Sequence, residues 1–403
     1  MPDARLSELF THRPFVRFWL ARLAGITANQ MLMVAVAWHV YDLTSSAWDL
    51  GLVGLFQFVP ALVMTLPAGH LADRLHRGRI FAACMLGQAL VAGLLVAATQ
   101  GGFATRELIF GVSIVLGVAR AFQMPAQQAL TPLLVPPALL QRAIALSSTG
   151  IQAAVIGGPA LGGVLYAAGA TTVYTCCAAL LLLACALTLT VRYRHVPSTE
   201  SATWRTVLAG VAFVWQRKVL LGATSLDLFA VLLGGATALL PIYARDILHT
   251  GPAGLGLLRA APAFGALAMS LVLTRWPLER RVGHRLLGAV AVFGVATVVF
   301  GLSTHFGLSL LALAVTGAAD NISVVTRLTL VQLETPDAMR GRVAAVNSIF
   351  IGASNQLGEF ESGATAALFG PVGSVVMGGV GTVLVAALWL RLFPALARRD
   401  RMV

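Results

Sequence analysis

Long apolar runs alternate with short polar clusters along almost the whole chain of 403 residues. Each run is roughly 20 to 28 residues long, and a helix needs about 20 apolar residues to cross a bilayer. The pattern therefore predicts an all-α membrane protein with twelve transmembrane helices. The predicted spans are 15–41, 47–69, 79–100, 106–130, 143–167, 171–192, 218–244, 253–274, 284–303, 306–333, 341–369 and 372–393.

Composition supports the same class of protein. Hydrophobic residues make up 58% of the chain and charged residues only 11%, whereas soluble domains carry about 25% charged residues. The net charge of +12 would suit a nucleic-acid partner, but the basic residues follow the ends of the spans and are not interleaved with aromatic residues. The four cysteines fall inside apolar runs without disulfide or metal-ligand spacing. We therefore expect no nucleic-acid partner, no metal and no cofactor.

The placement of charge predicts the orientation and the domain organisation. Most of the 28 lysines and arginines lie on the side that holds both termini, so both termini are expected in the cytoplasm. The longest connection, 193–217, separates two sets of six spans. Its segment 203–217 has an amphipathic helical pattern, which fits a surface helix or an ordinary helical linker equally well. We expect two pseudo-symmetric halves, 1–192 and 218–403, with the substrate path between them.

A charged motif follows the second span. The stretch "GHLADRLHRGRI" (69–80) places a small residue inside the span, a carboxylate at its end and arginines on the cytoplasmic side. It closely resembles the cytoplasmic signature of the major facilitator superfamily. The resemblance implies that fold and a gating role in charge contacts between helices. The gating residues would be Gly69, Asp73, Arg74 and Arg77.

Two further stretches resemble motifs of the same superfamily. "LGVARAFQ" (116–123) resembles the element tied to proton transfer, which implies roles for Arg120 and Gln123. "GGPALGG" (157–163) resembles the antiporter motif found in exporters, and it implies a hinge. Physically, a proline removes a helical hydrogen bond and glycines permit close packing. The hinge residues would be Gly158, Pro159, Gly162 and Gly163.

Finer features resemble the enterobactin-exporter-like and drug–proton antiporter branches of the superfamily. They are "FWLARLAGI" (18–26), "SSAWDLGL" (45–52) and "TPDAMRGRV" (335–343). The resemblance covers nearly the whole chain. It implies a multi-pass protein of the bacterial inner membrane that moves a small molecule outward.

Ionisable residues inside the spans are the candidates for chemistry, because charge in hydrocarbon is costly. The segment "NQLGEFESGATAALFG" (355–370) holds two of them, Glu359 and Glu361. These point roughly 200° apart on an ideal helix, so only one can face a cavity. Glu359 shares a polar stripe with Asn355 and is the preferred proton carrier, with Glu361 in a structural pairing; both being structural is the alternative. The proton-coupling candidates are Glu359, Glu361, Asp320, Asp227 and Arg120.

Amides inside the spans are the candidates for contacts with the substrate. They are Asn29, Gln30, Gln123, Asn321 and Asn355. No nucleotide-binding loop or hydrolase motif appears, so neither direct use of ATP nor an enzyme activity is expected.

The leading interpretation is a secondary active transporter, a proton-coupled exporter of a siderophore-like or amphipathic drug-like molecule that works by alternating access. A lipid or lysolipid flippase and a solute importer are the alternatives, and a membrane-embedded enzyme or receptor is a remote one. The expected partners are the small-molecule substrate, protons and membrane lipids, and the protein is expected to be a monomer.

Overall fold

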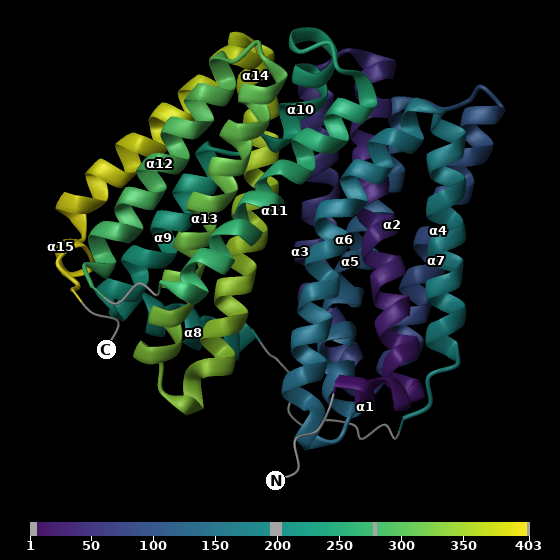
Figure 1. The fold of residues 1–403 in the computed structure, drawn as a ribbon, viewed down its shortest axis with the longest axis horizontal. Helices are drawn as coiled ribbons and strands as arrows, with labels where there is room; N and C mark the ends of the chain where they lie inside the picture. The colour runs from purple at the N-terminus through teal and green to yellow at the C-terminus, as the bar shows by residue number, and fades with distance from the viewer. Residues whose placement is uncertain (1–5, 194–203, 277–279, 401–403) are drawn as a thin grey trace. The chain divides into compact units, whose positions relative to one another are not determined.

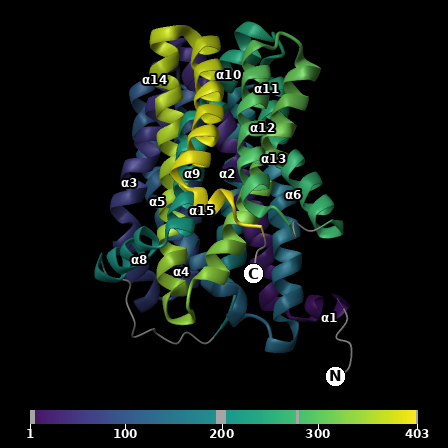
Figure 2. The same ribbon diagram turned by 90° about the vertical axis from the view of Figure 1, so that its left-hand side faces the viewer.

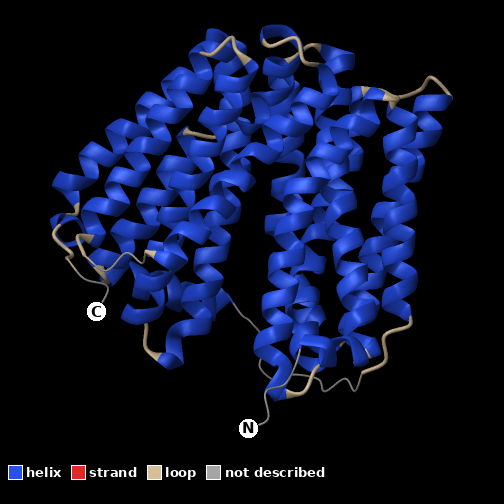
Figure 3. Ribbon diagram, viewed as in Figure 1, coloured by secondary structure: helices blue, strands red, loops and turns tan. Residues whose placement is uncertain are grey.

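The computed structural model describes residues 6–193, 204–276 and 280–400. Every regular element within these ranges is a helix (Figure 3). Eleven helical segments of the described chain are long and apolar enough to cross a membrane. The predicted class, an all-α multi-pass membrane protein, is confirmed.

The chain forms two compact units. The N-terminal unit comprises Met1–Leu43 and Val59–Ala202, and the C-terminal unit comprises Thr44–Phe58 and Thr203–Val403. Helix α3 (Ala47–Arg74) contributes its first part to the C-terminal unit and the rest to the N-terminal unit. The other elements of the N-terminal unit are α1 (Leu6–Thr11), α2 (Arg13–Thr44), α4 (Arg77–Gln100), α5 (Arg106–Leu130), η1 (Thr131–Leu133), η2 (Pro137–Leu139), α6 (Leu140–Ala167) and α7 (Ala170–Leu189).

The C-terminal unit contains the remaining helices (Figure 1). They are α8 (Trp204–Gln216), α9 (Lys218–Leu233), η3 (Ala236–Leu239), α10 (Leu240–Ile242), η4 (Tyr243–Ile247), α11 (Gly251–Arg275), α12 (Val282–Leu302), α13 (Phe306–Glu334), α14 (Asp337–Leu392) and α15 (Pro394–Ala397).

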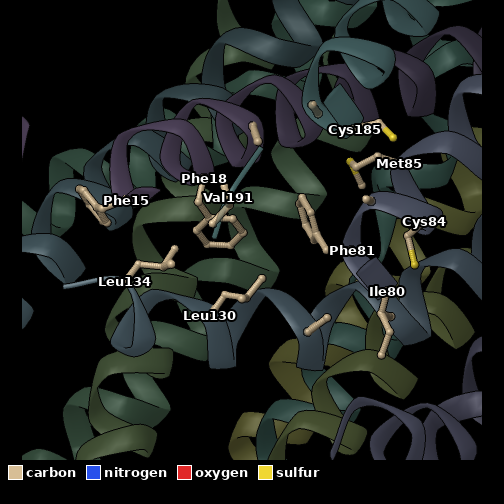
Figure 4. Close-up of a cluster of buried hydrophobic side chains, with 14 of the residues drawn as sticks. Phe15, Phe18, Ile80, Phe81, Cys84, Met85, Leu130, Leu134, Cys185 and Val191 are labelled. Carbon is tan, nitrogen blue, oxygen red and sulfur yellow. The ribbon is translucent and has the colours of Figure 1, made fainter. Parts of the chain in front are cut away.

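The N-terminal unit is held together by an apolar core in which α4 packs against α7 and α5 (Figure 4). The rings of Phe18 on α2 and Phe81 on α4 meet edge to face, with centroids 5.6 Å apart. Met85 lies one turn further along α4, beside Gly25 of α2. The cysteines Cys84 and Cys185 join the same cluster as small buried hydrophobes.

In the C-terminal unit, α12 packs on α14, α11 on α13, and α9 on α14. The yellow C-terminal arm of α14 runs beside α12 (Figure 2). Helix α14 is interrupted at Gly370, whose φ of 77° and ψ of 162° are not helical. Glycine adopts such a conformation without a steric penalty. The interruption separates the two arms that the sequence predicts as spans 341–369 and 372–393.

One predicted span differs from the structure. The apolar run 218–244 was expected to be one continuous helix, but α9 ends at Leu233. The chain then continues through the short helices η3, α10 and η4. Two consecutive glycines, Gly234 and Gly235, disfavour the helix, and Pro241 cannot donate a backbone hydrogen bond. The break matters because its residues, Gly234, Gly235, Ala236 and Thr237, line the cavity described in the next subsection.

Candidate functional site

A cavity of about 210 Å³ lies within the C-terminal unit. Its lining includes two carboxylates, those of Asp320 on α13 and Glu359 on α14, and no basic side chain. The other polar side chains of the lining are those of Thr237, Thr297, Thr316 and Asn355. The lining also includes two aromatic rings, those of Phe293 and Phe300. An acidic cavity without a base favours protons or other cations over anions.

Close backbone packing positions Glu359 at the cavity. Gly358 lies directly against Gly235 at the break after α9, and a side chain at Gly235 would collide with the Gly358 backbone. A side chain at Gly358 would collide with the Val231 and Leu232 carbonyl groups at the end of α9. Asn355 lies one turn before Glu359 and donates its amide N–H to the Ile351 carbonyl oxygen at 2.9 Å. Glu361 is half-buried and is absent from the cavity lining. Helical rotation of about 100° per residue accounts for the different directions of the two glutamates.

A buried ion pair lies beside the cavity. The Arg327 Nη1 and Asp227 Oδ2 atoms are 2.9 Å apart, and the two side chains are only 1% and 6% exposed. The same Nη1 donates to the Asn347 Oδ1 atom at 3.2 Å. The pair therefore joins α9, α13 and α14 through charged and polar contacts. Such a pair is costly to break, because removal of one partner leaves the other charge buried.

Asp320 lies between the ion pair and the cavity. It precedes Arg327 by two helical turns, on the same face of α13. A second cavity, of about 10 Å³, is lined by both Asp227 and Asp320, together with Ser323. That volume is about the minimum for one water molecule. The Asp320 carboxylate has no hydrogen-bond or ion-pair contact within the described part of the chain.

Four other predicted site residues, Asn321, Gln123, Asn29 and Arg120, are absent from the lining of the larger cavity. Asn321 donates to the Ser270 Oγ atom at 3.0 Å, which ties α13 to α11, and it is absent from the cavity lining. In the N-terminal unit, the buried Gln123 accepts a hydrogen bond of 2.9 Å from Gln88. Asn29 is partly buried on α2, and Arg120 is exposed on α5. Their proposed roles stay predictions.

The predicted hinge residues lie in one continuous helix, α6. Gly158 packs against Gln30 of α2, and Gly162 against the backbone of Met31. Pro159 and Gly163 are buried in the same stretch. The small residues therefore let α2 and α6 approach closely, while the hinge role stays a prediction.

The predicted gate lies partly outside the described residues, since the side chains of Asp73 and Arg74 are not described. Gly69 lies in α3 and Arg77 begins α4. The Tyr193 hydroxyl accepts the Gly78 N–H at 3.1 Å and is 3.2 Å from His76 Nδ1. Burial raises the pKa of Tyr193, and the Gly78 N–H and the Arg77 charge offset part of that effect. The neutral Tyr193 hydroxyl thus holds the connection between α3 and α4 through its contacts with Gly78 and His76.

Sequence reasoning did not select several of these residues. Asn347 and Tyr193 stand at the ends of apolar runs, where polar residues are ordinary. Thr316 could have been found, because it precedes Asp320 by one helical turn on the same face. Among the described residues, no group of three or more His, Cys, Asp and Glu could hold a metal ion.

Fold and site together define a membrane-spanning helical protein with an internal acidic cavity. Comparisons with known proteins identify its family. Residues 7–401 match the family described as "Transmembrane secretion effector". The enterobactin exporter EntS of Citrobacter koseri is 28% identical over 98% of this chain and 95% of its own length. EntS of Shigella boydii is 26% identical over the same shares.

Solved structures show the same fold. A mutant of the nucleoside transporter NupG superposes with a TM-score of 0.76 at 14% identity, covering 94% of this chain and 100% of its own. A bacterial homologue of the lysosomal transporter Spinster, in an inward-facing occupied conformation, gives 0.76 at 15% identity, covering 96% and 97%. This chain belongs to the transmembrane secretion effector family of the major facilitator superfamily.

Proposed function

We propose that the chain is a proton-coupled exporter of a small organic molecule that works by alternating access. The supporting observation is the cavity that carries the Asp320 and Glu359 carboxylates without a basic residue in its lining. A coupling site needs a group that is protonated in one state and ionised in another. Of the two, Glu359 is the proposed carrier that meets the substrate, since Asn355 beside it can hydrogen-bond a ligand.

The proposed substrate is siderophore-like or amphipathic. The full-length similarity to enterobactin exporters supports a siderophore-like molecule. The cavity of about 210 Å³ is smaller than the 300–1,000 Å³ typical of sites for drug-sized ligands. It would therefore hold one part of such a molecule rather than all of it.

The proposal extends to organisation and location. The two halves, 1–192 and 218–403, would be joined by the linker 193–217, and both termini would lie on the cytoplasmic side of a bacterial inner membrane. The basic residues at the span ends support that orientation. The protein would act as a monomer, with protons and membrane lipids as its other partners.

Purified protein in liposomes tests the function directly. An imposed pH gradient should drive accumulation of enterobactin, with proton movement followed by an entrapped pH-sensitive dye. Liposomes without protein and liposomes with the Glu359→Gln variant are the controls. Transport that is equally fast without a pH gradient would contradict proton coupling. Movement of a lysolipid but not of enterobactin would favour the flippase alternative.

A further inference from the structure

Three charged side chains share one buried region of the C-terminal unit, and their charges do not balance. Asp227 and Arg327 form the ion pair at 2.9 Å. Asp320 is within electrostatic reach of both. With all three groups ionised, the cluster carries one net negative charge. A net charge buried in a low-dielectric region is strongly disfavoured unless something neutralises it.

We propose that Asp227, Asp320 and Arg327 form a charge triad that binds a single proton on Asp320. The inference rests on the proposed function, because it names the site at which a coupling proton is held. Asp227 is excluded as the carrier, since its contact with Arg327 favours the ionised carboxylate. Arg327 and Asn347 act as positioning residues: the amide holds the guanidinium on Asp227 and leaves Asp320 to take the proton.

The surroundings of Asp320 support this assignment. From α9 it faces Asp227, from its own helix Arg327, and from α14 Glu359 across the larger cavity. Helices α11 and α12 contribute only apolar and hydroxyl side chains to the two cavities. No second base within the described lining competes for Asp320, so a proton is the group that restores neutrality.

The two cavities provide a route for that proton. The small cavity joins Asp320 to Asp227 and has Ser323 in its wall, so one water there has up to three polar partners. The larger cavity reaches Asp320 from the other side. Asp320 can therefore exchange a proton with the larger cavity while the ion pair behind it stays intact.

Charge arithmetic gives variants with opposite expected outcomes. Asp320→Asn removes the proton site and leaves a neutral pair. Asp227→Asn leaves one acid and one base, so Asp320 should stay ionised and bind no proton. The double variant Asp227→Asn with Arg327→Gln leaves Asp320 as the only charged group, and proton binding should return. Asp246→Asn, at an exposed carboxylate on η4, is the matched control.

Infrared difference spectroscopy of the full-length protein in lipid measures this proton without requiring transport. All proteins compared carry Glu359→Gln as well, which removes the band of the other proposed proton carrier. Stepping the pH should then reveal the carbonyl band of a protonated carboxylic acid in the protein with no further substitution. The band should be lost in Asp320→Asn and in Asp227→Asn, return in the double variant and persist in Asp246→Asn. Asp320→Asn keeps the Asp227–Arg327 pair and the double variant removes both of its members. Neither leaves half of that pair buried without its partner, so both should fold even if Asp227→Asn does not.

The outcomes separate this inference from the proposed function. A band that survives Asp320→Asn, a double variant without the band, or a response to sodium instead of pH would overturn the triad. If the band behaves as expected but liposomes show no pH-driven transport, the triad stands and the exporter proposal fails. If transport is pH-driven but the band is absent, the exporter proposal stands and the triad fails.

Discussion

The two units differ in one kind of buried contact. In the N-terminal unit, the described buried contacts join neutral groups: Gln88 donates to Gln123 at 2.9 Å, and the ring of His39 bonds the Tyr174 hydroxyl at 3.0 Å. The C-terminal unit also has neutral buried contacts, such as that of the Tyr243 hydroxyl with the Gly301 carbonyl oxygen, but one of its buried contacts joins full charges, Asp227 and Arg327. Neutral pairs fix helix positions at modest energy, whereas charges in hydrocarbon are retained when they do chemistry. The difference fits the proposed division of roles, with packing and bending in the N-terminal unit and proton chemistry in the C-terminal unit.

The largest expected effect tests the stability side of this comparison. Arg327→Gln should destabilise the protein by about 3–5 kcal/mol, because it leaves Asp227 buried without its partner. Gln88→Leu in the N-terminal unit should cost only about 1–3 kcal/mol, because it deprives a neutral amide of its donor. Thermal unfolding of both variants in one detergent measures the difference. Equal losses would remove the energetic distinction between the units.

The next effect concerns transport rather than stability. Glu359→Gln should abolish pH-driven export and spare substrate binding, because glutamine keeps the size and hydrogen bonding of glutamate but cannot titrate. Glu361→Gln is the matched control, two residues along the same helix and off the cavity. It should retain transport and lower thermal stability instead. Full pH-driven transport by Glu359→Gln would shift the carrier role to Asp320.

A smaller effect is expected from the predicted hinge of the N-terminal unit. Pro159→Ala should allow a backbone hydrogen bond to the Val155 carbonyl and stiffen α6. Turnover should fall severalfold while the Kd for the substrate stays the same. Initial transport rates and equilibrium binding, measured on the same preparation, separate the two quantities. Normal turnover at normal expression would show that Pro159 is only a packing residue.

The smallest effect concerns the connection between α3 and α4. Tyr193→Phe removes the hydroxyl that bonds Gly78 and His76, at a cost of about 1 kcal/mol. Burial raises the pKa of Tyr193 above its ordinary 10.0. The stabilisation from the protonated hydroxyl is therefore complete below pH 10.0 and is lost as the pH rises through the higher folded-state value. Unfolding midpoints should fall less steeply above pH 10.0 in Tyr193→Phe than in wild type; parallel curves would contradict the role.

The sequence was sufficient for the fold because apolar runs of spanning length have few alternatives to a membrane helix. The break at Gly234 was missed because it lies inside an apolar run, whose hydrophobicity is unchanged by a local bend. Asp320 and Glu359 were found as carboxylates in hydrocarbon. The pairing of Asp227 with Arg327 was not found, because a contact between distant helices leaves no mark in local spacing.

Asn321 illustrates the limit at the level of one residue. It was selected because it follows Asp320, yet one residue turns a helix by about 100°. That turn directs its amide to Ser270 on α11, at 3.0 Å, instead of into the cavity. Sequence identifies which residues are unusual in a span, and only packing decides which of them share a cavity.

The buried ion pair also has a consequence for biogenesis. About 100 residues separate Asp227 from Arg327, so ribosomes working at roughly 5–20 residues per second need about 5–20 s to make the second partner after the first. During that interval α9 enters the bilayer with an acid that has no base, and a central aspartate costs about 2.5–3.5 kcal/mol on insertion scales. Asp227 must therefore wait protonated or hydrated, and the arrival of α13 is the assembly step that ionises it.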